Sequence, residues 1–207
     1  ENSTWNCGGG RTPWNTWVSC EESPDGEVYQ VDPLGIREPQ KVNLLGETGR
    51  YESFAADNRD PANPVFYITE DRDNGALTRI TPKNVDPNGD PWDILHGDVD
   101  IAYLLLAADG TFSWTSDRQL ARPNAVEFYQ HSEGIDFYGD RLYFICKKVK
   151  MLFTLDMTAN TWTQSSTVSG VFEGQPDQIQ RLVDDDRDML YFTEEGGVYP
   201  GIHARDS

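Results

Sequence analysis

Short strand-like segments, separated by turn-forming residues, run through most of the 207-residue chain. Each segment is rich in β-branched and aromatic residues, as β-strands are, and the stretches SPDG, DPLG and DPNGDP between them are typical of turns. This alternation predicts an all-β fold built from many short strands. The predicted strands are residues 17–22, 27–33, 64–71, 76–82, 110–114, 133–147 (with an internal turn at YGD), 151–157, 161–167 and 188–195.

Several of these segments repeat one pattern, in which an apolar and aromatic strand runs into polar residues. VFYITED, RLYFICK and MLYFTEE share it, and TWVSCEE is a looser relative. The repeat separates Glu21 from Glu70 by 49 residues and Cys146 from Glu194 by 48, while the 76 residues from Glu70 to Cys146 must include an insertion. A period near 48 with several strands per unit is typical of a β-propeller blade, although a β-sandwich remains open.

We therefore predict a single domain over residues 1–207 that forms roughly four blades of a β-propeller. Propellers close into rings of about four to eight blades, so the ring is either small or continued in a longer protein, and we favour the second. No convincing amphipathic helix is visible. IAYLLLAA at 101–108 is either a strand or one to two helical turns, and residues 171–183 leave a short helix open. No apolar run is long enough for a membrane span.

The chain is strongly acidic, with 35 acidic and 17 basic residues and a net charge of −18. Nucleic acids and anionic membranes are therefore unfavourable partners, because both carry the same sign of charge. Acidic residues suit cation binding, and calcium in particular. The alternative is that the acidity only keeps the protein soluble.

The stretch NCGGGRTPWNTWVSCEE at 6–22 concentrates two cysteines, three consecutive glycines and two glutamates. The glycines allow a tight backbone and the close approach of another group. A thiolate beside carboxylates suits a transition metal, whereas carboxylates and carbonyls alone suit calcium. The alternative is a structural disulfide between Cys7 and Cys20, with Glu21 and Glu22 in solvent. The sequence leaves both interpretations open.

This stretch resembles the signature of the PhoX alkaline phosphatase family, also known as DUF839. Further blocks resemble the family in the same order along the chain: GRYESFAAD at 49–57, PVFYITEDRDNGALTRITP at 64–82, EGIDFYGDRLYF at 133–144, GQPDQI at 174–179 and LYFTEEGG at 190–197. The resemblance implies a six-bladed propeller with metals at its centre, which hydrolyses phosphate monoesters with an iron–calcium cluster. It also implies a secreted or periplasmic protein, and the sequence leaves an organelle lumen open as another extracytoplasmic location.

The resemblance assigns metal ligands residue by residue. Cys7 matches the iron-binding cysteine of the family, and Glu22 and Glu70 match carboxylate ligands. The remaining acidic positions are assigned to calcium or to completion of the cluster, and they are Glu52, Glu133, Asp177 and Glu194. Glu52 follows Tyr51, where the family has a histidine.

One departure from the family bears on activity. Active members carry an arginine two positions before the glutamate of the EGI motif, where it clamps phosphate, and this chain has His131 there. An arginine forms a fork for oxyanions that a histidine does not reproduce. Arg122 is the substitute that we consider. The alternative function is a non-catalytic, calcium-stabilised propeller that serves as a binding or structural subunit, with a protein partner that completes the propeller or docks on it.

Overall fold

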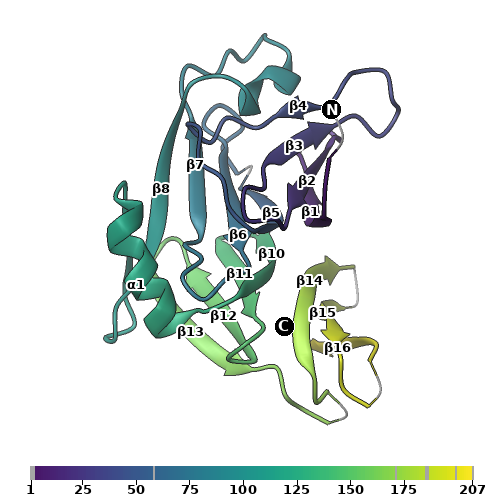
Figure 1. Cartoon of the computed structure of the whole chain (residues 1–207), viewed down its shortest axis with the longest axis vertical. Coiled ribbons are helices and arrows are strands. Elements are labelled where there is room, and N and C mark those ends of the chain that lie inside the picture. Colours follow the sequence, from purple (N-terminus) through teal and green to yellow (C-terminus); the bar gives the residue numbers. More distant parts are fainter. Residues whose placement is uncertain (1–2, 58, 171, 185–186, 199, 207) are drawn as a thin grey trace.

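The structure is a computed structural model that describes residues 3–206 except 58, 171, 185–186 and 199. Within these residues, four antiparallel sheets follow one another along the chain and are arranged around a common axis (Figure 1). Most connections join neighbouring strands of one sheet through short turns, as the dense turn signals of the sequence predict.

The four sheets are the four blades of the predicted propeller. Blade 1 consists of β1 (Asn6–Arg11), β2 (Trp17–Glu21), β3 (Val28–Val31) and β4 (Gln40–Lys41). Blade 2 consists of β5 (Tyr51–Asp57), β6 (Val65–Glu70), β7 (Thr78–Pro82), β8 (Val99–Leu106) and β9 (Phe112–Thr115). Blade 3 consists of β10 (Ser132–Tyr138), β11 (Arg141–Cys146), β12 (Met151–Asp156) and β13 (Thr161–Ser166). Blade 4 consists of β14 (Gln175–Val183), β15 (Asp188–Glu195) and β16 (Ile202–Asp206).

The first strand of each blade lies at the centre of the arrangement. Strand β1 contacts β5, β5 contacts β10, and β10 contacts β14, although these strands are far apart in the sequence. The four first strands therefore line one axial channel, which is the defining feature of a propeller. The predicted all-β, propeller-like fold is confirmed.

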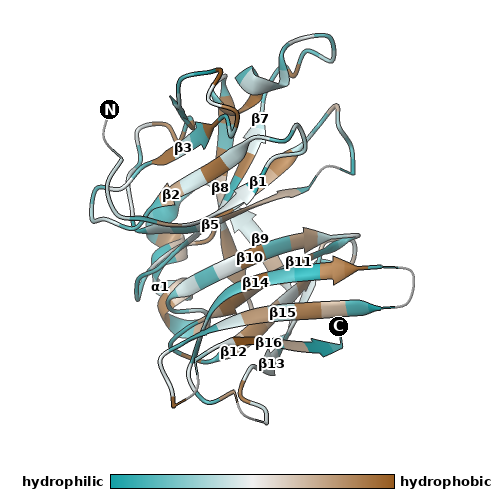
Figure 2. Cartoon of the chain, turned by 90° about the vertical axis from the view of Figure 1, so that its right-hand side faces the viewer, coloured by the Kyte–Doolittle hydropathy of each residue, from teal (hydrophilic) through white to brown (hydrophobic). Residues whose placement is uncertain are grey.

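The hydrophobic core lies between neighbouring blades. Val18 of blade 1 packs in one cluster with Phe66 of blade 2, and Leu104 of blade 2 packs in another with Phe153 of blade 3. A third cluster joins Ile145 to blade 4. Figure 2 shows the apolar stretches along the strands of these sheets. Each blade is thus buried against the next one, which explains why the strands are apolar in their central residues.

The faint sequence repeat corresponds to the second strand of each blade. Strands β2, β6, β11 and β15 carry the four similar motifs, and each pairs with the inner strand of its own blade. The longer interval between Glu70 and Cys146 is also explained. Blade 2 has a fifth strand, β9, and the chain then forms helix α1 (Arg118–Phe128) before it enters blade 3.

The sequence analysis did not predict helix α1, and its list of strands also lacked the inner strands β1, β5 and β14. Asp117 caps the helix by accepting hydrogen bonds from Gln119 N and Leu120 N. The helix buries only Ala121 and Ala125, so it has no broad apolar stripe that would mark it in the sequence. A 3₁₀ helix, η1 (Pro91–Leu95), precedes β8. Among the described residues, no helix combines the length and apolar character that crossing a bilayer requires.

The two ambiguous segments both form strands. Residues 101–108 contribute most of β8, whose eight residues end at Leu106. Residues 175–183 form β14, so the short helix left open for 171–183 is not formed in that part, and residue 171 lies outside the described residues. In both cases pairing with a neighbouring strand satisfies the backbone, which a short apolar run cannot reveal by itself.

Candidate metal centre

Each inner strand contains an irregularity at the same place, near its start. The pairing register shifts between Asn6 and Gly9 in β1, and between equivalent residues of the other three inner strands. A β-bulge of this kind turns a side chain away from the regular alternation of the strand. The first residue inside each shift is a candidate metal ligand, and the four residues are Cys7, Glu52, Glu133 and Asp177. We call them the bulge residues.

The residues after the bulge residues lie where neighbouring inner strands approach closely. A Cβ atom at Gly8 would lie 2.4 Å from Ser53 Oγ, and one at Gly134 would lie 2.4 Å from Ile179 N. A Cβ atom at Gly10 would lie 2.0 Å from the carbonyl oxygen of Phe54. Larger residues would push the strands apart, so glycines in the NCGGGR stretch let β1 pack closely against β5.

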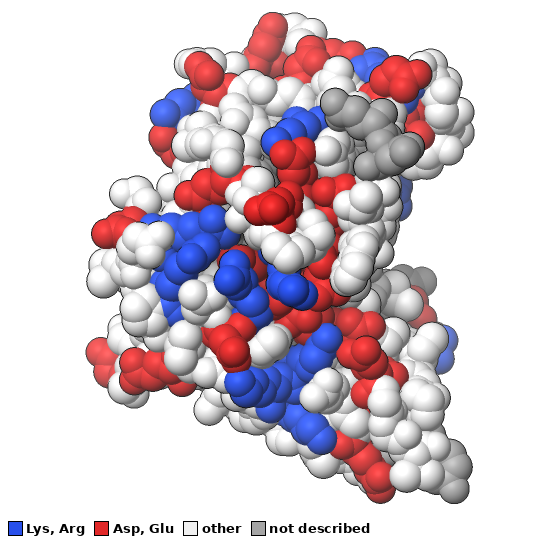
Figure 3. Space-filling view, in the orientation of Figure 1, with Lys and Arg blue, Asp and Glu red and all other residues white. Residues whose placement is uncertain are grey.

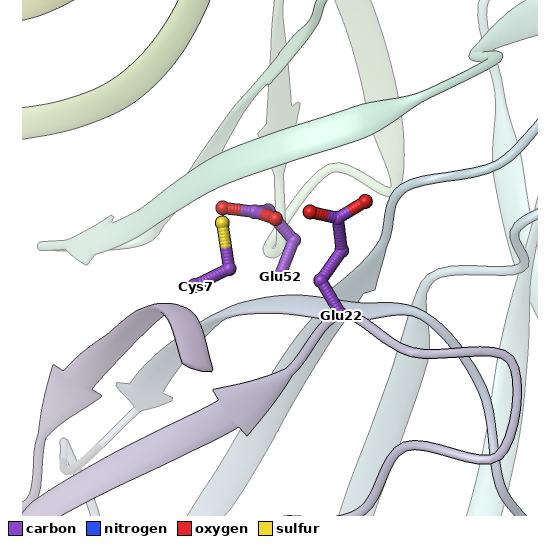
Figure 4. A group of neighbouring side chains, drawn as sticks. All are labelled: Cys7, Glu22 and Glu52. Carbon is purple, nitrogen blue, oxygen red and sulfur yellow. The ribbon is translucent and has the colours of Figure 1, made fainter. Parts of the chain in front are cut away.

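One candidate site combines sulfur and oxygen. Atoms of Cys7, Glu22 and Glu52 that can ligate a metal all lie within 4.8 Å of one another. Figure 4 shows the three side chains turned toward one another at the ends of three chain segments. Cys7 comes from β1, Glu22 directly follows β2, and Glu52 comes from β5. A thiolate with two carboxylates is a donor set that suits a transition metal such as iron.

A second candidate site contains oxygen donors only and shares a residue with the first. Ligand atoms of Glu52, Glu133 and Asp177 lie within 4.8 Å of one another. These residues belong to three inner strands, β5, β10 and β14. Three carboxylates are a donor set that suits calcium. Because Glu52 belongs to both groups, the two sites are adjacent.

Two of the three carboxylates of the second site, those of Glu52 and Glu133, are buried and incompletely satisfied. The side chain of Glu52 is fully buried, and its Oε1 accepts hydrogen bonds from Gln178 Nε2 at 2.7 Å and from Gly8 N at 3.3 Å, whereas Oε2 has no partner among the described residues. Glu133 is 1% exposed. Lys147 Nζ lies 2.8 Å from Glu133 Oε1 as an ion pair without hydrogen-bond geometry, and Glu133 Oε2 has no partner among the described residues. Such buried, unpaired oxygens require a functional explanation.

The electrostatics of the site disfavour negative charge in the absence of a cation. Burial, together with the charges of Asp177, Glu22 and Asp71, raises the pKa of Glu52 to about 7, even though the adjacent Cys7 thiol lowers it. Burial and the neighbouring Asp71 and Glu52 raise the pKa of Glu133 to about 10. Partial desolvation of the sulfur and the contact with Glu52 also raise the pKa of the Cys7 thiol well above its ordinary value, although the residue as a whole is exposed. A bound cation would favour the deprotonated form of each of these groups.

Two predicted ligands, Glu70 and Glu194, lie outside both groups. Glu70 is fully buried, accepts a hydrogen bond from Ala76 N at 3.2 Å and pairs with Arg118 at 3.1 Å. Glu194 accepts a hydrogen bond from Glu173 N at 2.8 Å and lies 2.8 Å from His203 Nε2. Both carboxylates are therefore engaged by protein groups.

Glu70 and Glu194 have a shared position in their blades. Each pairs with the residue that precedes the bulge of the inner strand, as do Glu21 in blade 1 and Cys146 in blade 3. We call these four residues the facing residues. Glu21 accepts a hydrogen bond from Glu27 N at 3.1 Å, six residues ahead, just as Glu70 does from Ala76 N. The facing glutamates thus fasten the loops at this end of the blades.

The two predicted catalytic residues, His131 and Arg122, are not in either metal group. His131 precedes β10, and its ring lies 2.5 Å from Asp71 Oδ1 and 3.2 Å from Asp73 Oδ1. It adopts a φ of 54°, which is uncommon for a residue other than glycine. Arg122 lies on α1, where it lines a surface hollow with Asn74 and Gln119.

The sequence interpretation missed three charged residues beside the second site. Asp71 and Glu195 each contact the ammonium of Lys147, which also contacts Glu133. Figure 3 shows basic and acidic side chains gathered together across the middle of one face of the molecule. Aligning the repeated motifs SCEE, ITED, FICK and FTEE would have placed Asp71, Lys147 and Glu195 at the same position as Glu22.

The cysteines are free thiols. Cys20 and Cys146 are buried and Cys7 is exposed, so the alternative disulfide between Cys7 and Cys20 is not formed. Cys7 therefore keeps the thiol that the first metal group needs.

A cavity of about 970 Å³ extends away from the metal groups along the inner strands. Gly8 and Gln178, which hydrogen-bond to Glu52, belong to its lining, and Phe54, Ile135 and Ile179 form part of its apolar wall. The cavity continues to Trp17 and Ile202, which are 45% and 74% exposed. Its outer part is thus an open apolar surface between blades 1 and 4.

Comparison with known proteins supports the resemblance seen in the sequence. The model of the family "Alkaline phosphatase PhoX" matches residues 3–59, which contain Cys7, Glu22 and Glu52. The structure of Pseudomonas fluorescens PhoX, described as a complex with vanadate, a transition state analogue, matches with a TM-score of 0.69 and 14% sequence identity. This match covers 97% of the present chain and 58% of the PhoX chain.

A second structural match is much weaker. The structure of a PQQ-bound aldose sugar dehydrogenase from Streptomyces coelicolor matches with a TM-score of 0.38 and 11% identity, over 100% of this chain and 82% of that one. A similarity at that level carries no conclusion. No curated protein matches the sequence. The chain therefore resembles the PhoX alkaline phosphatases in sequence over residues 3–59 and in fold over nearly its whole length, as its motifs predict.

Proposed function

We propose that this chain belongs to a metal-dependent phosphomonoesterase of the PhoX type, whose metal ions bind at the mouth of the propeller channel. The observation that carries the proposal is the pair of adjacent ligand groups that share Glu52. Buried carboxylate oxygens of Glu52 and Glu133, two members of these groups, have no hydrogen-bond partners among the described residues. The matched PhoX chain is longer than this one, so the activity of the whole protein is part of the proposal.

The donor sets of the two groups indicate which metals they would hold. Cys7, Glu22 and Glu52 would hold iron, because a thiolate favours a transition metal over calcium. Glu52, Glu133 and Asp177 would hold calcium, because all their donors are oxygens. Metal ions bound there would polarise the phosphoryl oxygens of a substrate and reverse the local negative field of an acidic protein.

In this scheme, neighbouring residues hold the side chain of Glu52 in position. Gln178 and the backbone amide of Gly8 hold one oxygen of Glu52, which leaves the other oxygen without a hydrogen-bond partner among the described residues. Ser53 Oγ donates to Gln178 Oε1 at 2.7 Å and orients that amide. The contact links β5 to β14, so the position of Glu52 depends on packing between blades 2 and 4.

Elemental analysis and turnover together test the proposal. The purified 207-residue chain, supplied with iron and calcium and then dialysed, is expected to retain both metals and to hydrolyse p-nitrophenyl phosphate. Removal of the metals by a chelator should abolish turnover, and returning both should restore it. E52Q should lose metal and turnover, whereas E21Q, a facing residue, should keep both. A chain that retains neither metal would overturn the proposal.

A second candidate function is a non-catalytic, calcium-stabilised propeller that acts as a binding or structural subunit. The observation that favours it is the position of His131, which stands in place of the phosphate-clamping arginine and is held by Asp71 and Asp73. In that case the same experiment gives retained calcium, a raised unfolding temperature on calcium addition and no turnover.

The proposal also covers the open apolar surface between blades 1 and 4. We propose that further β-strands of a protein partner cover Trp17, Leu182 and Ile202, since large exposed apolar side chains commonly mark interfaces. The amides of β16 should then exchange hydrogen more slowly in the complete assembly than in the isolated chain, and equal exchange would contradict this. The proposed location is extracytoplasmic, and a tagged full-length precursor found in the cytoplasm would argue against it.

A further inference from the structure

Lys147 occupies a position at which the other three blades carry an acid. It directly follows the facing residue Cys146, and its amide donates to the carbonyl oxygen of His131 at 2.9 Å. In blades 1 and 2 the amides of Glu22 and Asp71 make the same contact with the chain that precedes β1 and β5. The equivalent residue of blade 4 is Glu195, which pairs with Gln175. The residues at these four equivalent positions are therefore Glu22, Asp71, Lys147 and Glu195.

The ammonium of Lys147 lies among carboxylates from three blades. Its Nζ is 2.8 Å from Glu133 Oε1, 3.3 Å from Asp71 Oδ2 and 3.2 Å from Glu195 Oε2. The side chain of Lys147 is only 20% exposed, and those of Glu133 and Asp71 are 1% and 9% exposed. The contact with Asp71 is a hydrogen bond, and those with Glu133 and Glu195 are ion pairs.

This arrangement bears directly on the second ligand group. Glu133 belongs to that group together with Glu52 and Asp177. Its Oε1 faces Lys147, whereas its Oε2 has no partner among the described residues. Burying so many carboxylates together without a compensating charge would be costly. Lys147 supplies one positive charge at a fixed place.

We propose that Lys147 is a built-in cation: its ammonium occupies the place that a divalent cation would otherwise take between Asp71, Glu133 and Glu195, and it positions Glu133 for the neighbouring ligand group. Lys147 is therefore a positioning residue, and it limits the number of metal ions that this channel mouth takes up. The positioning of Glu133 rests on the metal-binding part of the proposed function, whereas the replacement of a divalent cation by the ammonium is tested independently of it and of turnover.

Replacing the ammonium by calcium requires only a small inward movement of the three surrounding carboxylates. Calcium–oxygen distances are about 2.3–2.6 Å, so the three carboxylates would move inward by less than about 1 Å each. Glu195 is 60% exposed and can adjust, and water can complete the coordination once the lysine stem is removed. The substitution Lys147→Ser provides that space, whereas Lys147→Met removes the charge and keeps the stem.

The test counts bound calcium by elemental analysis after equilibrium dialysis of the full chain against calcium alone. K147S is expected to bind one calcium ion more per chain than the wild type. K147M is expected to bind no additional ion, because its stem still fills the space. The matched control is K148S, since the neighbouring Lys148 is 53% exposed and pairs with Asp73 at the surface. K148S should bind the same number of ions as the wild type.

Two further measurements show whether the additional calcium binds the three carboxylates and whether K147S folds. In the K147S background, E195Q should weaken the additional calcium at least tenfold, because it removes one of the three carboxylates. If K147S is unfolded without calcium, its recovery on calcium addition supports the proposal, and failure to fold at every calcium concentration overturns it. Equal calcium counts for folded K147S and the wild type, or an extra ion in K148S, also overturn it.

The outcome separates this inference from the proposed function. An additional calcium ion in K147S, with no metal bound to the wild type, would support the role of Lys147 while the proposed metal centre fails. Calcium and iron in the wild type, with no additional ion in K147S, would support the proposed metal centre and overturn the role of Lys147.

Discussion

The bulge residues and the facing residues occupy equivalent places in all four blades but serve different purposes. The bulge residues Glu52 and Glu133 are buried with carboxylate oxygens that lack hydrogen-bond partners among the described residues. The facing residues Glu21, Glu70 and Glu194 are also buried, but they accept hydrogen bonds from backbone amides. Burial alone therefore does not indicate a ligand. A buried carboxylate whose oxygens stay unpaired indicates a functional site, whereas a satisfied one indicates structure.

The largest expected effect follows from breaking a facing residue. E70Q removes the buried charge that pairs with Arg118, whose side chain is only 11% exposed. The guanidinium keeps Glu47 at 3.1 Å but loses its fully buried partner, so the free energy of unfolding is expected to fall by about 3 kcal/mol, measured by urea denaturation. The exposed Glu127 on α1 provides the control, and E127Q should change stability little. Loss of bound metal without loss of stability would show that Glu70 is a ligand after all.

The next effect follows from breaking a bulge residue. E52Q is expected to weaken binding of both metals at least tenfold, or about 1.4 kcal/mol each, because Glu52 belongs to both groups. The metal-free variant should be as stable as the metal-free wild type or more stable, since an unpaired buried carboxylate is lost. Metal titration and urea denaturation in a chelator measure the two quantities. A large loss of stability in the metal-free variant would contradict the distinction between the two sets.

A third prediction separates the two ligand groups from each other. C7A should lower the retained iron and leave calcium unchanged, because Cys7 belongs only to the first group. C146A alters the equivalent facing position of blade 3, a fully buried residue, and should leave both metals in place. Elemental analysis of both variants checks this. Equal loss of iron in the two variants would indicate general destabilisation.

The smallest effect is expected at the facing residue of blade 4. E194Q removes a partner of His203 but leaves no buried arginine unpaired, and the new amide oxygen can still accept from Glu173 N. We therefore expect a smaller loss of stability than for E70Q and unchanged metal content. A loss of metal equal to that of E52Q would place Glu194 with the bulge residues.

Much of the fold and part of the site could be predicted from the sequence. The strand motifs and their spacing indicated blades, and Cys7, Glu22, Glu52, Glu133 and Asp177 came together in adjacent groups. Helix α1 was missed because only Ala121 and Ala125 are buried on it. Glu70 and Glu194 were assigned to the metals because a motif cannot show whether a carboxylate is already hydrogen-bonded.

The sequence by itself determined that this chain forms blade-like antiparallel sheets, because turn residues and apolar strand residues are local signals. Only the tertiary structure decided which acids meet. A strand alternates its side chains strictly, and the register shift at each inner strand, which depends on pairing between strands, changes which residue faces the channel. The ammonium of Lys147 among three carboxylates from three blades is likewise a result of packing between elements that are distant in sequence.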